Sequence, residues 1–143
     1  MKLCISLIVF FILVTSAAFS QDTITILINN KKAALCISSP EQTGTNLPIK
    51  KATLKLIRSV AVQVKSDHTR ATIYKRDLEI AGDDPVIIGE LRSRPGYFNL
   101  SKTSFKKDLL AGKILQLYLL MNPANEKMMI PSRRVFLANL MMK

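Results

Sequence analysis

Few residues in this chain could perform catalytic or metal chemistry, and they stand apart from one another. His68 is the only histidine, and Cys36 is the only cysteine after the first twenty residues. A zinc site needs three or four such ligands, so these two are too few. The one adjacent acidic pair, Asp83 and Asp84, lacks the alternating oxygen ligands of an EF-hand loop. No glycine-rich phosphate loop or GxSxG motif occurs, so we predict a non-enzyme that needs no cofactor and no metal.

Basic residues are the other chemical feature, because 21 Lys and Arg face only 10 Asp and Glu, a formal net charge of +11. Such a charge attracts polyanions, including lipopolysaccharide, acidic polysaccharide and other anionic glycan or lipid surfaces. The alternative is that scattered cations only keep a β-rich protein soluble and protect its strand edges. Aromatic residues do not interleave with the basic runs, so specific nucleic-acid binding is not expected. The candidate polyanion-binding residues are Lys75, Arg76, Arg92, Arg94, Lys106, Lys107, Arg133 and Arg134.

The first twenty residues predict a signal peptide. Lys2 precedes a short apolar core at residues 5–14, and small side chains follow at Ala18 and Ser20. An uncleaved membrane anchor is the alternative, but the core is shorter than the roughly 20 residues that span a bilayer. We therefore expect export to the periplasm or the outside of the cell, with no membrane span after cleavage. Residues 21–143 would form a single domain in which Cys36 packs as a small buried hydrophobe, although a reactive or intermolecular thiol is the other reading.

Elsewhere, short β-branched runs alternate with turn-forming clusters, which is typical of an all-β domain. Residues 29–32 predict a turn that joins strands at 23–28 and 33–38 into a hairpin. Two prolines and a glycine predict a loop over residues 39–48. Helical spacing of Phe105, Leu109 and Leu110, with Gly112 as terminator, predicts one short helix at 101–111. Further strands are predicted at 53–65 (one strand, or two broken near residue 57), 70–80 (with a second strand starting at 78), 86–91, 97–100, 114–121, 127–130 and 135–142.

The segment 114–121 is the most informative of these strands. It is too short to cross a bilayer as a helix, and Gly112 and Pro123 bound it. Both of its faces are largely apolar, as in a central strand or a strand that a partner covers. Ile114, Tyr118 and Leu120 form the candidate partner-binding face, for another envelope protein or for self-association. Together the strands predict an immunoglobulin-like β-sandwich of seven to nine short strands with one short helix.

The second part of the chain, about residues 53–143, resembles the C-terminal domains of the GldM family. The resemblance is carried by SVAVQVK at 59–65, GYFNLSK at 96–102, DLLAGKILQLYLLM at 108–121 and a final apolar strand at 135–140. Lys113 follows Gly112 here, where that family usually has aspartate. The resemblance implies an immunoglobulin-like sandwich, export in a Bacteroidetes-type bacterium, and contacts between proteins of gliding or type IX secretion machinery. It carries over no functional residue.

The leading hypothesis is therefore an exported, non-catalytic module that mediates protein–protein contacts in the bacterial envelope and is related to gliding or secretion machinery. The alternative is a cationic secreted protein that binds polyanions by charge. A third reading, an inhibitor secreted against other cells, has the same sequence features as the first.

Overall fold

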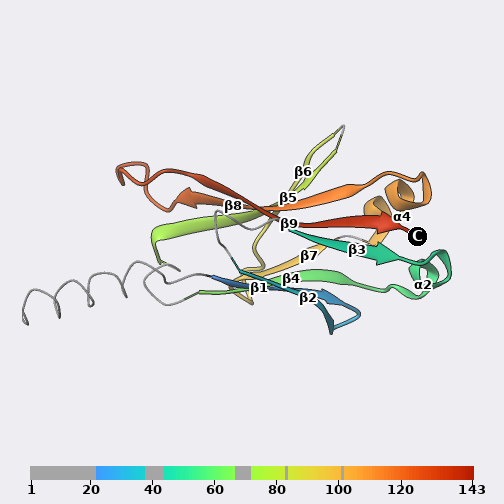
Figure 1. The fold of residues 1–143 in the computed structure, drawn as a ribbon. Helices are drawn as coiled ribbons and strands as arrows, with labels where there is room; N and C mark the ends of the chain where they lie inside the picture. Colours follow the sequence, from blue (N-terminus) through green and yellow to red (C-terminus); the bar gives the residue numbers. More distant parts are fainter. Residues whose placement is uncertain (1–21, 38–43, 67–71, 83, 101) are drawn as a thin grey trace, which may run out of the picture.

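A computed structural model of the chain describes residues 22–37, 44–66, 72–82, 84–100 and 102–143 (Figure 1). The predicted signal peptide, His68 and Asp83 lie outside these residues. The described part is mainly β, with nine strands in two sheets and two short helices. This confirms the all-β class and the upper end of the predicted strand number, whereas the expectation of a single helix is wrong.

The first sheet has four antiparallel strands. They are β1 (Thr23–Ile28), β2 (Lys31–Ile37), β4 (Val60–Lys65) and β7 (Tyr97–Leu100), in the order β2-β1-β4-β7. The predicted hairpin forms β1 and β2, but its turn is only two residues long, and Lys31 and Lys32, which were expected in the turn, begin β2. Asn29 and Asn30 in its turn both have positive φ, of 50° and 63°, as a tight two-residue hairpin turn requires.

The second sheet has five strands in the order β3-β9-β8-β5-β6. They are β3 (Thr45–Ile49), β5 (Tyr74–Ala81), β6 (Val86–Gly89), β8 (Leu115–Pro123) and β9 (Arg133–Met142). Neighbours are antiparallel except β3 and β9, which are parallel. The apolar strand predicted at 114–121 is β8, and it occupies the centre of this sheet.

The two sheets form two layers around one hydrophobic core (Figure 1). The four-stranded sheet contributes the buried side chains of Val60, Val62 and Val64, which are alternate residues of β4 and therefore lie on one face. The five-stranded sheet contributes Leu117 and Leu119 of β8, which are fully buried. Alternating residues of both sheets therefore supply the core, as in other packed pairs of sheets.

Two helices connect the sheets. Helix α4 (Lys102–Leu110) confirms the predicted helix and buries Phe105 and Leu109, but Leu110 is exposed, contrary to its predicted place on the same side. Helix α2 (Lys51–Leu56) occupies the first part of the segment predicted as strand at 53–65. Leu54 and Leu56 would share one face of the predicted strand, but in the structure Leu54 is buried and Leu56 is exposed. A six-residue helix is too short to show the 3.6-residue period in sequence.

Three further expectations are corrected. The predicted loop at 39–48 ends early, because β3 begins at Thr45 and includes Pro48 as an edge strand. Leu78 does not start a new strand but continues β5. Residues 127–130 form no strand and belong to the connection between β8 and β9.

Candidate functional site

The outward side of the five-stranded sheet carries a compact group of interacting side chains. We call Glu79, Tyr118, Leu120, Arg134 and Phe136 the outer face. Because alternate residues of β5 and β8 point into the core, Glu79, Tyr118 and Leu120 must point the other way. Strand pairing sets Tyr118 between Glu79 on β5 and Phe136 on β9, and sets Leu120 opposite Arg134.

A bulge in β9 decides which of its residues join this face. The register between β8 and β9 shifts between Leu117 and Tyr118, so that Leu137 is an extra residue on β9. Leu137 and the adjacent Ala138 are both fully buried. Arg134 and Phe136 therefore point outward before the bulge. After the bulge, Asn139 joins the outward side and donates a hydrogen bond to Asn46 Oδ1 of β3 at 2.8 Å.

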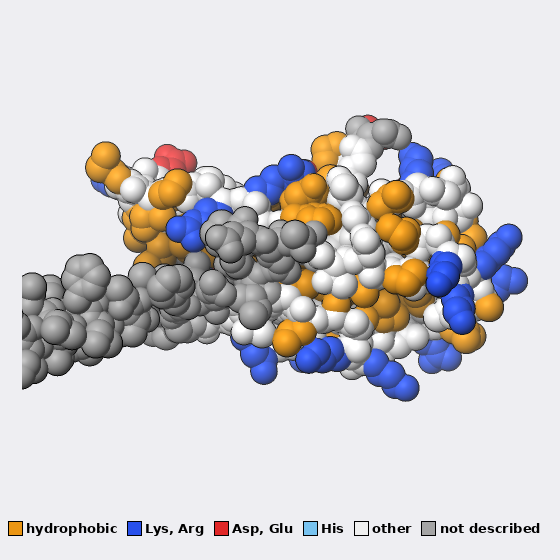
Figure 2. Space-filling view, viewed as in Figure 1, with side chains coloured by type: hydrophobic (Ala, Val, Ile, Leu, Met, Phe, Trp, Pro, Cys, Tyr) orange, Lys and Arg blue, Asp and Glu red, His pale blue; other side chains and the backbone are white. Residues whose placement is uncertain are grey.

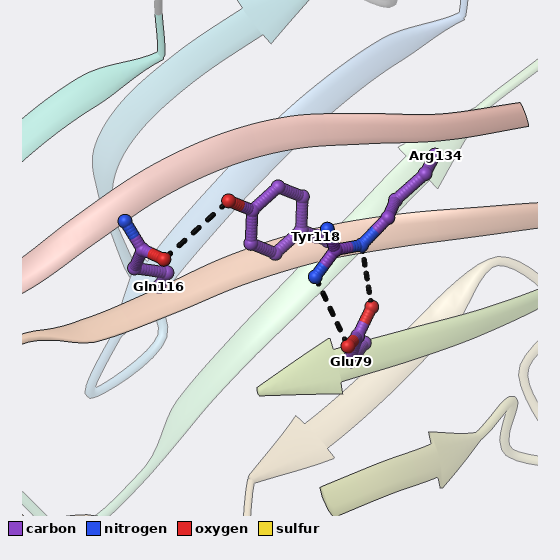
Figure 3. Close-up of polar contacts among 4 residues, drawn as sticks. All are labelled: Glu79, Gln116, Tyr118 and Arg134. Atoms are coloured by element: carbon purple, nitrogen blue, oxygen red, sulfur yellow. Dashed lines mark hydrogen bonds and ion pairs between the residues drawn. The ribbon is translucent and has the colours of Figure 1, made fainter. Parts of the chain in front are cut away.

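Arg134 is fixed by two kinds of contact (Figure 3). Its Nε and Nη2 donate to the two carboxylate oxygens of Glu79 at 2.8 and 3.1 Å, a bidentate ion pair. Its guanidinium carbon lies 3.7 Å from the centroid of the Tyr118 ring, within the range of a cation–π contact. The hydrogen bond with Glu79 raises the pKa of Arg134 above its ordinary value, so the guanidinium stays charged at any physiological pH.

Tyr118 is the centre of the group. Its ring packs against Phe136 with centroids 5.2 Å apart and planes tilted by 42°. Its hydroxyl donates to Gln116 Oε1 at 3.4 Å, on the side away from Arg134 (Figure 3). The ring is thus in contact with both the Arg134 guanidinium and the Phe136 ring, and these contacts restrict its rotation.

Phe136 also depends on a close backbone approach from Gly44. A Cβ at Gly44 would overlap the Phe136 ring, and Gly44 has a φ of +69°, which favours glycine. The segment entering β3 therefore covers one part of this ring. On the opposite side of the face, Ile87 of edge strand β6 lies across from Glu79 and is 55% exposed.

Chemically, the outer face is suited to binding. Its only opposite charges, Glu79 and Arg134, already satisfy each other, so neither is poised as an acid, a base or a nucleophile. Aromatic residues and arginine are enriched in the centres of protein interfaces, where they supply most of the binding energy. A rigid face with Tyr, Phe, Arg and exposed Ile has this composition.

The structure divides the predicted partner-binding face. Tyr118 and Leu120 lie on the outer face and are half-buried. Ile114 precedes β8 and is 53% exposed, but it lines a separate hollow of about 330 Å³ with Phe105 and Lys113. Sequence reasoning missed Glu79 and Phe136, since nothing local in the sequence indicates that they flank Tyr118.

Two of the predicted polyanion-binding residues are already neutralised. Arg76 is buried rather than on the surface, because β5 points it between the sheets toward Asp22 at 3.7 Å. It also donates a hydrogen bond to Ser66 Oγ at 2.6 Å. Arg76 is therefore not available to a polyanion at the surface, and its prediction as a binding residue is wrong. Arg134, which is paired with Glu79, belongs to the outer face.

The other predicted basic residues are distributed over several places. Lys75 and Arg92 line a hollow of about 460 Å³ together with Asp77 and Glu90, so acidic groups accompany them. The guanidinium of Arg94 lies 4.2 Å from the centroid of the Tyr97 ring. Arg133 is at the start of β9, and Lys106 and Lys107 are on α4. The eight residues form no single surface.

Among the described residues, no group of three or more His, Cys, Asp or Glu side chains could hold a metal ion. The described part of the chain likewise has no helix that is both long and apolar enough to span a bilayer. Cys36 is 2% exposed, and its Sγ lies 3.5 Å from the carbonyl oxygen of Leu137, which confirms its prediction as a buried residue. Comparison of the chain with protein-family models, curated proteins and solved structures finds no match.

Proposed function

We propose that this protein is an exported, non-catalytic module with an immunoglobulin-like fold that binds another protein of the bacterial envelope. The partner would contact the outer face of the five-stranded sheet. The observation that carries the proposal is the preorganised group of Tyr118, Phe136 and the Glu79–Arg134 pair on that face.

The strand order supports the immunoglobulin-like part of the proposal. The neighbours β9, β8, β5 and β6 correspond in chain order and in pairing to strands G, F, C and C′ of a variable-type domain. In the other sheet, the neighbours β1, β4 and β7 correspond to A, B and E. Helix α4 then lies in the connection between E and F.

Preorganisation supports a role in binding. Freezing flexible side chains at an interface costs about 0.5–1.5 kcal/mol for each one. Arg134 is already fixed by Glu79 and Tyr118, so a partner that stacks on this group would meet side chains whose mobility is already restricted. Ile87 adds an exposed apolar contact at the margin.

The location in the envelope and the link to gliding or secretion machinery rest on two sequence features. These are the signal-peptide pattern of the first twenty residues and the resemblance of residues 53–143 to GldM C-terminal domains. Genes next to this one that encode secretion or motility components would strengthen the link, and neighbours unrelated to the envelope would weaken it.

Site-specific photo-crosslinking tests the binding face. A photoreactive phenylalanine analogue would replace Ile87 in one variant and Leu35 in a control, in cells that naturally produce the protein. Leu35 is a matched control because it is 51% exposed, against 55% for Ile87, and lies on β2 in the other sheet. We expect a defined crosslinked species from position 87 only, identified by mass spectrometry.

The crosslinked species must then behave as a specific partner. Ile87→Asp should weaken its affinity for the purified protein by about tenfold, because a charge would be placed in an apolar contact, whereas Leu35→Asp should not change it. Equal crosslinking from both positions, or no crosslinking from position 87, would contradict the proposal. A crosslink to a second copy of the same chain would identify self-association as the contact made by this face.

A further inference from the structure

Both described helices lie at the same end of the molecule (Figure 1). Helix α2 connects Ile49, the last residue of β3 in the five-stranded sheet, with Val60, the first residue of β4 in the four-stranded sheet. Val60 pairs with Leu100, so the end of β7 lies beside the start of β4. Helix α4 follows Leu100 and leads back to Leu115 in the five-stranded sheet. Each helix therefore crosses from one sheet to the other at this end, which we call the helical end.

Helix α2 and its flanks are strongly basic. Lys50, Lys51, Lys55 and Arg58 are all exposed, and residues 49–59 contain no acidic residue. The buried side of the helix is formed by Leu54 alone, so the lysines extend into solvent. Four cations within nine residues create a concentrated positive potential on this side of the helical end.

Neighbouring segments add further basic residues. The turn between β1 and β2 is held against α2, because Asn29 donates to the Leu56 carbonyl oxygen at 3.1 Å, and the exposed Lys31 and Lys32 follow it. Lys107 is exposed on α4. Figure 2 shows Lys and Arg side chains gathered over this end and along the adjacent edge. The acidic Asp108 of α4 is paired with Lys113 at 3.8 Å.

Each of the two helices ends in an exposed leucine that is close in sequence to these basic residues. Leu56, the last residue of α2, is 71% exposed, and Leu110, the last residue of α4, is 60% exposed. Neither leucine takes part in the core, in contrast to Leu54 and Leu109 of the same two helices. Exposed apolar side chains combined with nearby basic residues are typical of protein segments that lie in the interface of a membrane.

We infer that the helical end docks on the surface of a bilayer rich in anionic phospholipids. The lysines would contact lipid phosphate groups, while Leu56 and Leu110 would enter the boundary between headgroups and acyl chains. A soluble polyanion would satisfy the lysines but offer no apolar environment to the leucines, so the combination favours a lipid surface. The outer face runs along the side of the molecule and would remain accessible, so this inference does not rest on the proposed function.

Tryptophan fluorescence tests the inference directly, because the chain contains no tryptophan. Leu56→Trp places a single reporter at the helical end, and Leu110→Trp provides a second one. Met129→Trp is the control, because Met129 is fully exposed in the connection between β8 and β9 at the opposite end. All variants are purified after export from the cells that naturally produce the protein, so any processing of the first twenty residues is common to them.

With vesicles of phosphatidylglycerol and phosphatidylcholine, we expect the emission of the Leu56→Trp and Leu110→Trp variants to shift to shorter wavelength. Pure phosphatidylcholine vesicles should leave both spectra unchanged, and the Met129→Trp variant should not respond to either lipid. Lys51→Gln and Lys55→Gln, added to the Leu56→Trp variant, should weaken binding because each removes one cation. The lipid concentration at which the emission shift is half complete should rise by about 25-fold, or about fivefold for each lysine. Lys127→Gln with Arg133→Gln, a matched charge loss at the opposite end, should leave it unchanged.

Several results would overturn the inference. One is an unchanged spectrum of both helical-end reporters with anionic vesicles, and another is an equal shift with neutral vesicles. Heparin in solution should bind without moving the emission. If heparin produced the same shift as anionic vesicles, the helical end would be a polyanion site and not a lipid-docking surface.

Discussion

The buried ion pair between Asp22 and Arg76 gives the sharpest test of how the two sheets are held together. Asp22 directly precedes β1 in one sheet, and Arg76 lies in β5 of the other. Their side chains are 0% and 6% exposed, and their charged atoms are 3.7 Å apart. Asp22→Ala would leave the Arg76 guanidinium between the sheets without this carboxylate, although its hydrogen bond to Ser66 would remain.

The size of the effect follows from burial. Removing one partner of a buried ion pair costs about 3–5 kcal/mol, because the other charge stays desolvated. The retained bond to Ser66 places the expected loss near the lower value, about 3 kcal/mol. Small domains have a total free energy of unfolding of about 5–15 kcal/mol, so this is a large share. With a urea dependence of about 1–3 kcal/mol per molar, the unfolding midpoint should fall by about 1 M or more.

Urea unfolding followed by circular dichroism would measure Asp22→Ala, Arg76→Met and the double variant. The double variant should lose less than the sum of the two single losses, because no lone charge then remains buried. The control is Glu79→Ala, which breaks the ion pair with the half-exposed Arg134 and should cost about 1 kcal/mol or less. If Asp22→Ala cost no more than this control, or if the single losses added, the reasoning would be refuted.

Two further predictions concern backbone and core, and both use unfolding in urea as the measurement. Gly96→Ala should destabilise by about 3 kcal/mol, because φ is +71° and the new Cβ would collide with the Val64 carbonyl oxygen, whereas Gly112→Ala, with φ +78° and open space, should cost about 1 kcal/mol. Equal losses would show that the contact with Val64 is unimportant. Leu119→Ala should cost about 2–5 kcal/mol because its side chain is fully buried, and Leu120→Ala about 1 kcal/mol or less because it faces outward; the reverse order would contradict the register of β8.

Sequence reasoning succeeded where one segment carries its own signal. Alternation in β8 is complete on its inner side, so its strand character and central position could be predicted from residues 114–121 alone. The hairpin turn at Asn29 and Asn30 was predictable because these residues tolerate positive φ. Helix α4 was predictable from the spacing of Phe105 and Leu109.

It failed where a distant partner decides the outcome. In α2, Leu54 and Leu56 alternate as they would in a strand, yet the segment forms the helix that connects β3 of one sheet with β4 of the other. Arg76 has the sequence neighbours of a surface residue, but Asp22 lies 54 positions away in the chain and is brought to it by packing of the sheets.

The binding group on the outer face was only half predictable for the same reason. Tyr118 stood out because it lies on the second face of an apolar strand. Its contacts to Glu79 and Arg134 depend on the pairing of three strands. The register between β8 and β9 also depends on the bulge at Leu137. No local pattern marks such a bulge.

The parallel pairing of β3 with β9 has a consequence for how the molecule is made. Thr45 of β3 pairs with Ala138 of β9, so a strand near the start of the chain can pair only after the last strand is present. A polypeptide delivered from its amino terminus can complete the hairpin of β1 and β2 at once, but β3 gains its neighbour only when nearly the whole chain has emerged. Shortening the chain by even its final strand would leave β3 and β8 each with an open hydrogen-bonding edge, which is the condition that favours aggregation.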